Sequence, residues 1–91
     1  MSLNVITLIS ELSDDETEET EVFAEIDSVG QNEFFAAEQA GFRPEFRAKI
    51  WREEYDNETI LQLDGKKYDI YRTFECPGGK IELYAQHRVG V

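Results

Sequence analysis

Three tight-turn signals divide the second half of the chain into four short segments, and this division constrains the fold more than any other feature. Asp64-Gly65 is typical of a two-residue hairpin loop, because a type I′ turn needs positive φ at both positions and this dipeptide tolerates it. Asp56-Asn57 and Pro77-Gly78-Gly79 are expected to act as turns too. The predicted strands are therefore residues 45–54, 58–63, 66–75 and 80–88.

The predicted hairpins place their apolar side chains on one common face. A loop at Asp64-Gly65 pairs Leu61 with Tyr68, and a loop at Asp56-Asn57 pairs Ile50 with Leu63 and Arg52 with Leu61. Because the separate turns agree on one apolar face, we expect residues 45–88 to form a four-stranded antiparallel meander with that face buried. The expected core face consists of Phe46, Ala48, Ile50, Leu61, Leu63, Tyr68, Ile70, Phe74, Ile81, Leu83 and Ala85.

The first half adds two strands and one helix. Residues 4–10 are rich in β-branched side chains, and residues 21–29 alternate, with Val22 on one face and Phe23 on the other. Residues 31–40 carry good helix formers followed by Gly41, which predicts a helix with an apolar stripe of Phe34, Phe35 and Ala37. A chain of 91 residues supports one modest core, so residues 1–91 are expected to be a single domain. The predicted fold is mainly β, a small six-stranded antiparallel β-barrel with one short helix between strands 2 and 3.

The charge is unevenly distributed along the chain. The net charge is −11, and residues 1–42 contain eleven acidic residues and no Lys or Arg. A surface of this sign repels phosphate backbones, so no direct nucleic-acid binding is expected. Residues 11–20 are uniformly polar and self-repelling, which predicts a mobile acidic loop. Two interpretations of it stay open, a solvated linker and a binding loop that orders on assembly.

The predicted polar face of the meander also carries aromatic side chains. Two interpretations compete, because the helix could cover these aromatics or they could form an exposed patch that contacts a partner. Basic residues around aromatics suit a contact with an acidic surface, so we expect an interface between this face and the acidic loop of a neighbour. The candidate interface residues are Arg47, Lys49, Trp51, Lys67, Tyr71 and Tyr84 on one side, and Asp14, Asp15, Glu16, Glu18 and Glu19 on the other.

The residue types that carry catalysis are scarce. His87 is the only histidine and has no Cys, His or paired carboxylate at ligand spacing, and the single Cys76 lies in a turn sequence. No apolar run approaches the roughly 18 residues of a membrane helix, and no secretory signal is visible. We therefore expect no catalytic residue, no metal, no cofactor and no membrane association, so the protein is not expected to be an enzyme.

Two stretches resemble a known family. Glu21-Val-Phe-Ala-Glu-Ile-Asp-Ser-Val-Gly-Gln-Asn-Glu-Phe-Phe-Ala-Ala-Glu-Gln-Ala-Gly-Phe-Arg-Pro44 resembles the strand–helix core of the tailed-bacteriophage head-closure proteins, also called head–tail joining or stopper proteins. Leu63-Asp-Gly-Lys-Lys-Tyr-Asp-Ile-Tyr-Arg-Thr73 is similar to their hairpin signature, and Ile81-Glu-Leu-Tyr-Ala85 with Val89-Gly90-Val91 to their last strand and tail.

The resemblance implies a structural protein of virion assembly. It implies a β-barrel that is monomeric when free and joins a ring under the portal and adaptor proteins of the phage head-tail connector, with tail proteins docking below. It also implies that the ring closes the DNA-filled head, that no cofactor is used, and that the protein occurs in the host bacterial cytoplasm during assembly and then in the virion.

Two alternatives stay open. A tail-terminator or tail-completion subunit of the same tail interface has a similar architecture. An acidic DNA-mimic inhibitor would imitate phosphates with carboxylates spaced along a rigid surface.

Overall fold

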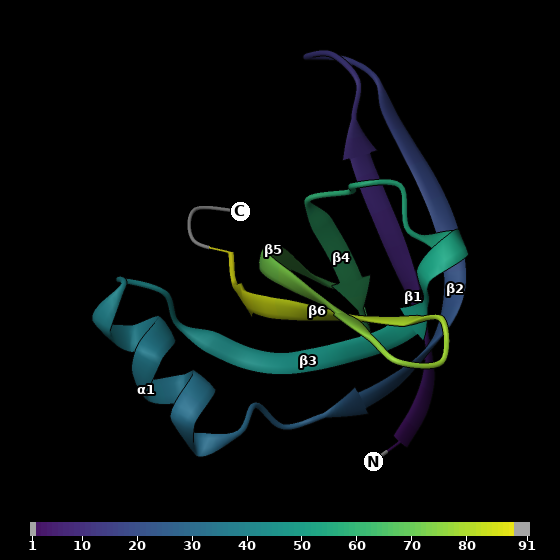
Figure 1. Ribbon diagram of the computed structural model, residues 1–91. Coiled ribbons are helices and arrows are strands. Elements are labelled where there is room, and N and C mark those ends of the chain that lie inside the picture. The colour runs from purple at the N-terminus through teal and green to yellow at the C-terminus, as the bar shows by residue number, and fades with distance from the viewer. Residues whose placement is uncertain (1, 89–91) are drawn as a thin grey trace.

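The structure is a computed structural model that describes residues 2–88 of the chain. Six strands, one α-helix and one short 3₁₀ helix account for most of it (Figure 1). Their bounds are β1 Ser2–Glu11, β2 Thr17–Asp27, α1 Gln31–Gln39, β3 Pro44–Trp51, η1 Arg52–Glu54, β4 Ile60–Leu63, β5 Lys66–Cys76 and β6 Lys80–His87. The tail residues Val89–Val91, which contributed to the family resemblance, lie outside the described residues.

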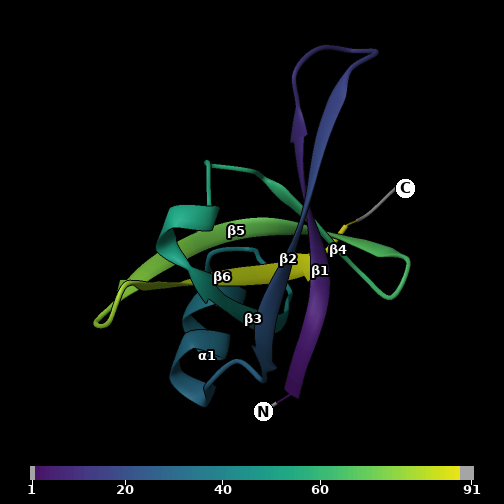
Figure 2. The ribbon, with the colours of Figure 1, turned by 90° about the vertical axis from the view of Figure 1, so that its right-hand side faces the viewer.

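The strands form a closed antiparallel barrel in the order β1-β2-β3-β6-β5-β4. Figures 1 and 2 show β1 and β2 crossing one side of it, with α1 attached at a distance from them near β3. The predicted six-stranded barrel with a single short helix between strands 2 and 3 is thus confirmed.

The hairpin predicted at Asp64-Gly65 is present. Asp64 and Gly65 have φ of 52° and 80°, as a type I′ turn requires. Leu61 pairs with Tyr68, as expected. The local sequence therefore fixes the register of β4 against β5.

The expected meander of residues 45–88 is wrong in one connection. β3 pairs with β6 rather than with β4, so Ile50 lies opposite Ile81, and the expected partners Leu63 and Leu61 are not opposite Ile50 and Arg52. Asp56-Asn57 is no hairpin loop, because η1 and residues 55–59 carry the chain away from β3. The Tyr55 hydroxyl donates to the Glu58 carbonyl at 2.7 Å, which holds this segment in its own loop. β4 is therefore free to pair with β1 and close the barrel.

The core matches the predicted face with one exception. Phe74 is 51% exposed because a β-bulge between Ile70 and Arg72 shifts the register, and Phe74 then pairs with the outward-facing Glu82. Leu63, Tyr68 and Ile70 are partly buried against the core. The buried cluster consists of Ile6, Leu8, Val22, Ala24, Phe46, Ala48, Ile50, Leu61, Ile81, Leu83 and Ala85.

The acidic segment is more regular than predicted. β1 continues to Glu11 and β2 begins at Thr17, with Glu11 opposite Thr17, so the loop of residues 11–20 shrinks to a turn at residues 12–16. Backbone ladder hydrogen bonds form regardless of side-chain polarity, which is why the composition of this segment was misleading. All side chains from Glu11 to Glu21 are exposed, and Figure 1 shows this hairpin extending beyond the barrel. The mobility of its turn stays a prediction.

The helix has the predicted bounds to within one residue but buries less than expected. Gly41, at a φ of 93°, ends α1 in a Schellman motif, in which its N–H bonds to the Glu38 carbonyl and that of Phe42 bonds to the Ala37 carbonyl. Ala37 is the only buried helix residue, so the expected apolar stripe is wrong for Phe34 and Phe35.

Candidate interaction surfaces

A carboxylate on α1 attaches the helix to the outer face of β5. The Glu33 carboxylate accepts hydrogen bonds from the Tyr71 hydroxyl at 3.0 Å and from Arg72 Nε at 3.1 Å. The Arg72 guanidinium holds the pKa of Glu33 below its ordinary value, and burial together with this hydrogen bond raises the pKa of Tyr71. These three residues, called the helix latch below, fix the position of α1.

The helix latch covers the aromatic side chains of the adjacent sheet. Phe42 stacks on Tyr71 with ring centroids 4.8 Å apart, and the Arg72 guanidinium lies 4.3 Å from the Tyr84 ring centroid. Tyr84 is only 5% exposed and Tyr71 is partly buried. Within the subunit, Tyr71 is thus covered by Phe42 and the α1 carboxylate and Tyr84 by Arg72, so the expectation that Tyr84 is an exposed anchor is wrong.

Arg47 and Lys49 lie close to the buried carboxylate of Glu82 on the same outer face of the sheet. Glu82 is 8% exposed, and it lies 3.5 Å from Arg47 and 4.0 Å from Lys49 while it accepts a 2.9 Å hydrogen bond from the Tyr84 hydroxyl. A buried carboxylate needs such partners to offset its lost hydration. Arg47 also pairs with Asp27 at 3.5 Å, so both cations are committed within the subunit.

Trp51 belongs to a different surface of the barrel, on which apolar side chains of β1, β2 and β3 are exposed. Trp51 is 49% exposed with the Lys80 ammonium 4.3 Å from its ring centroid. Leu3, Val5 and Phe23 are 68%, 50% and 67% exposed, and Val5 is the cross-strand partner of Phe23. We call Leu3, Val5, Phe23 and Trp51 the hairpin patch.

A groove crosses the hairpin patch between Phe23 and Trp51. Its volume is about 220 Å³, and Leu3, Lys49, Lys80, Glu25 and Glu54 also line it. This site could have been found in the sequence, because the alternating pattern places Phe23 on the solvent side of its strand, between acidic residues. A large apolar side chain at an exposed position often marks a contact surface.

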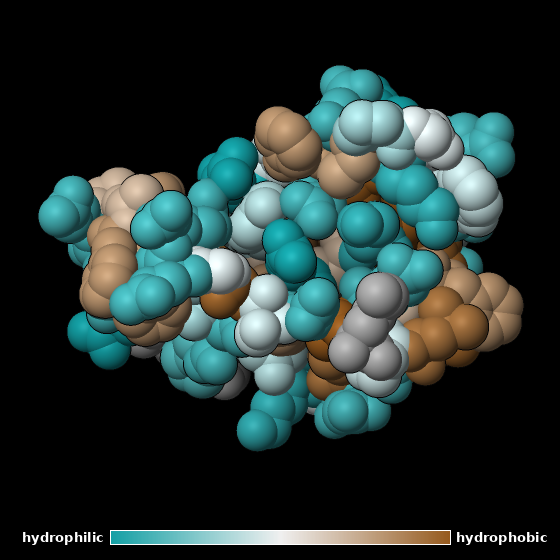
Figure 3. Space-filling view, turned by 60° about the horizontal axis from the view of Figure 1, so that its bottom comes forward, coloured by the Kyte–Doolittle hydropathy of each residue, from teal (hydrophilic) through white to brown (hydrophobic). Residues whose placement is uncertain are grey.

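A second apolar surface lies on α1. Phe34 and Phe35 are 37% and 53% exposed, with their rings edge to face at 6.3 Å between centroids. We call these two residues the helix patch. Figure 3 shows apolar side chains gathered on two opposite flanks, on the left over α1 and on the right over β1 and β2.

The predicted acidic partner residues are accessible. Asp14, Asp15, Glu16, Glu18 and Glu19 are all exposed at or near the turn of the β1–β2 hairpin. Asp14, Asp15 and Glu16 belong to the turn, which extends beyond the barrel in Figure 2, whereas Glu18 and Glu19 lie on β2 opposite Ser10 and Ile9. The structure therefore leaves them available but does not bring them near the predicted basic residues of the same subunit.

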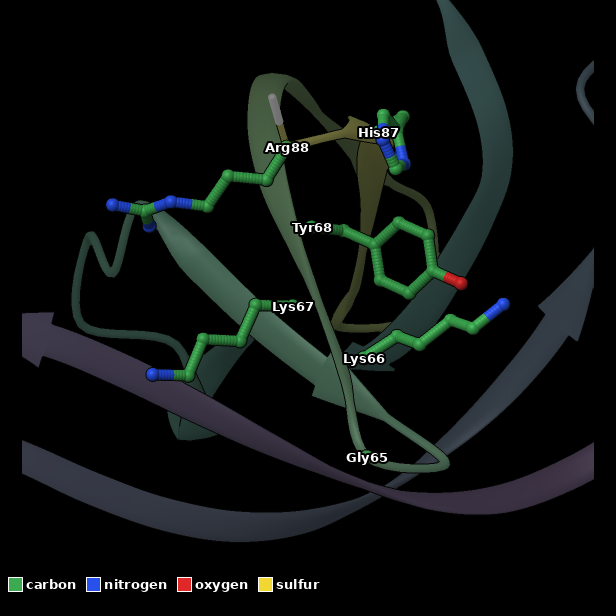
Figure 4. A pocket seen from close by; sticks show the side chains of 6 residues that line it. All are labelled: Gly65, Lys66, Lys67, Tyr68, His87 and Arg88. Atoms are coloured by element: carbon green, nitrogen blue, oxygen red, sulfur yellow. The ribbon is translucent and has the colours of Figure 1, made fainter. Parts of the chain in front are cut away.

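Lys67 lies apart from the other predicted basic residues. It lines a cavity of about 430 Å³ with Gly65, Lys66, Tyr68, His87 and Arg88 (Figure 4). In Figure 4, Lys67 and Arg88 point to one side and Lys66 to the other, so their charges do not converge on one point. Arg88 also pairs with Asp69 at 3.6 Å.

Within residues 2–88, no three His, Cys, Asp or Glu side chains are grouped so that they could hold a metal ion. In the same part of the chain no helix has the length and apolar character to span a membrane. The exposed apolar patches and the acidic hairpin are prominent surface features of the described residues.

A comparison of the chain with protein-family models, curated proteins and solved structures finds no match to any of them.

Proposed function

We propose that this chain is a structural subunit of the head-to-tail connector of a tailed bacteriophage, which assembles into a ring that closes the DNA-filled capsid and provides a platform for the tail. The proposal rests on the family resemblance of residues 21–44 and 63–73. These residues form the β2–α1 segment and the β4–β5 hairpin, which agrees with the strand–helix and hairpin character of the two signatures.

The observation that carries the proposal is the pair of unlike apolar patches on opposite flanks. A ring needs heterologous contacts, in which one surface of a subunit meets a different surface of the next. The hairpin patch and the helix patch are different surfaces and face away from each other (Figure 3). Exposed apolar patches on a small domain are typical of protein contacts.

The charge distribution agrees with a position beside packaged DNA. The acidic hairpin carries seven carboxylates between Glu11 and Glu21. Like-charge repulsion prevents adhesion of the DNA to this surface. A ring that surrounds a DNA passage benefits from such repulsion.

The test is incorporation into capsids. A tagged chain is produced in a bacterial host together with the capsid, portal and tail proteins of the phage that encodes it, and the capsids are purified and imaged. We expect the tag in a ring at the portal vertex, and untailed heads when the gene is deleted. Capsids that join tails normally without the chain would overturn the proposal. A ring at the tail end before head joining would instead assign the tail-terminator role.

One observation favours a second candidate, an acidic DNA mimic. Glu18, Glu19 and Glu21 lie on a regular strand rather than in a loop, so their carboxylates have a defined spacing. A pull-down from host extract discriminates the two functions. Recovery of a nuclease or another DNA-binding protein, released by competing duplex DNA, would support the mimic.

A further inference from the structure

We infer that the helix patch of one copy of this chain packs into the groove of the hairpin patch of the next copy. This inference rests on the proposed function, because it names the contact by which the ring would close. The occupant of the groove is thus α1 of a second copy, through its Phe34 and Phe35 side chains.

The receiving surface is already formed in the single subunit. Val5 and Phe23 are paired across the β1–β2 ladder, and Phe23 and Trp51 both line the groove. The Lys80 ammonium lies 4.3 Å from the Trp51 ring centroid, so a positive charge stands at this side of the groove. A cavity of about 220 Å³ between aromatic walls suits an inserted aromatic ring.

The inserting surface is equally well positioned. Glu33 binds Tyr71 and Arg72 on one side of α1, and Ala37 is buried against the barrel. With that side attached, Phe34 and Phe35 remain 37% and 53% exposed. Two neighbouring rings on a fixed helix lose little conformational entropy on binding, so they are suitable anchors.

One pair of opposite charges can form between the two surfaces. α1 contains Glu33 and Glu38 and no basic residue, and Glu38 follows Phe34 by four positions, so both lie on the same side of the helix. Lys80 lines the groove together with Lys49, Glu25 and Glu54, and Lys49 is already paired with Glu82. The Lys80 ammonium lies 3.9 Å from Glu25, at the outer limit of an ion pair, so it retains capacity for the carboxylate of an incoming Glu38.

The positions of the patches favour a second copy over a contact within one subunit. They lie on opposite flanks in Figure 3, so α1 cannot reach the groove of its own chain. A contact between unlike surfaces is heterologous, and repeating it produces a ring or an open filament rather than a closed dimer.

Cysteine cross-linking tests the contact, since Cys76 is the only native cysteine. In a Cys76→Ser background, Phe35→Cys and Trp51→Cys are purified separately as full-length chains and then mixed under mild oxidation. We expect a disulfide-linked heterodimer in the mixture, no homodimer in either variant alone, and a ladder of oligomers from the chain that carries both substitutions. Phe74→Cys is the matched control, since Phe74 is 51% exposed but belongs to neither patch.

A charge swap provides the second readout. Glu38→Lys should weaken heterodimer formation about tenfold, and Lys80→Glu on the receiving chain should restore it. Homodimers of Trp51→Cys would show that the groove pairs with itself, and heterodimers formed equally with Phe74→Cys would show random collision. Either outcome, or no cross-link up to the solubility limit, overturns the inference. A heterologous cross-link from a chain that does not enter capsids would instead keep the contact and overturn the proposed function.

Discussion

β6 and β2 both contribute to the core, yet their outer faces differ completely. From Ile81 to Ala85 every residue of β6 is buried, whereas β2 has only Val22 and Ala24 buried among its 11 residues. The difference comes from what covers each strand. The helix latch and the cations around Glu82 cover the outside of β6, whereas none of residues 2–88 covers Phe23 on the outside of β2 in a comparable way. Exposed apolar side chains thus gather where the helix does not reach, and there a partner can bind without disturbing the fold.

The largest difference between the two strands is expected in the free energy of unfolding after one apolar side chain in each is truncated. Leu83→Ala on β6 should lower the free energy of unfolding by about 2–5 kcal/mol, because Leu83 is fully buried and its loss leaves a cavity. Phe23→Ala on β2 should change it by less than about 0.5 kcal/mol, because that ring is 67% exposed. Urea unfolding of both variants measures the difference. Equal losses would mean that the outer face of β2 is covered in the free protein.

A smaller effect on the free energy of unfolding is expected from replacing Glu82, the buried carboxylate on the outer face of β6. Glu82→Gln should lower the free energy of unfolding by about 1–3 kcal/mol, because Arg47 and Lys49 lose their buried partner and the Tyr84 hydroxyl keeps only a neutral acceptor. Glu75→Gln is the control, as its 72% exposed side chain makes only a surface pair with Arg52. Similar midpoints in urea for the two variants would contradict the structural role of Glu82.

The helix latch should contribute about 1 kcal/mol to the free energy of unfolding, and this contribution should depend on pH. Because Arg72 lowers the pKa of folded Glu33, the stabilisation is present above the ordinary value of 4.5 and is lost as the pH falls through the lowered folded pKa. Comparison of Glu33→Gln with the native chain by urea unfolding between pH 7 and pH 3 checks this. The two curves should converge at the acid end, and a constant difference would mean that another residue holds α1.

The smallest effect concerns the acidic hairpin. Glu18→Gln with Glu19→Gln should raise the free energy of unfolding by no more than about 0.5 kcal/mol, since the lost repulsion is between solvent-exposed charges. The gain should disappear in high salt, which screens the native charges equally well. A thermal transition recorded at low and high salt distinguishes this from a change in packing. A marked destabilisation would mean that these carboxylates make contacts within the subunit.

Short-range signals in the sequence predicted most of the fold. Alternation and turn signals predicted the inward faces of β2, β3, β4 and β6, and Asp64-Gly65 predicted one register, because both are properties of neighbouring residues. The pairing of β3 with β6 and of β1 with β4 depends on barrel closure, which no local pattern specifies. The bulge at Tyr71 was equally invisible, and it turned Phe74 outward.

The candidate site was harder to predict than the fold. The sequence left open whether the helix covers Tyr71 and Tyr84, and it predicted that the helix packs through an apolar stripe, whereas the helix is attached through Glu33 and Ala37 and leaves Phe34 and Phe35 exposed. A charged group that fastens a helix has no periodic signature. The hairpin patch combines side chains from β1, β2 and β3, which only the folded barrel brings together.

The seam of the barrel, where β1 pairs with β4, is expected to form late in folding. β1 joins β4 through three residue pairs, of which Ile9 with Ile60 spans about fifty positions of the chain, whereas β1 joins β2 through ten. The N-terminal hairpin can therefore form early, but its closure against β4 must await the collapse of the intervening strands, because bringing distant segments together costs loop entropy. We expect refolding on the millisecond-to-second scale typical of such non-local β topologies. A substitution at Leu8 or Leu61, fully buried at this seam, should then act mainly on the unfolding rate, because the seam contacts form last.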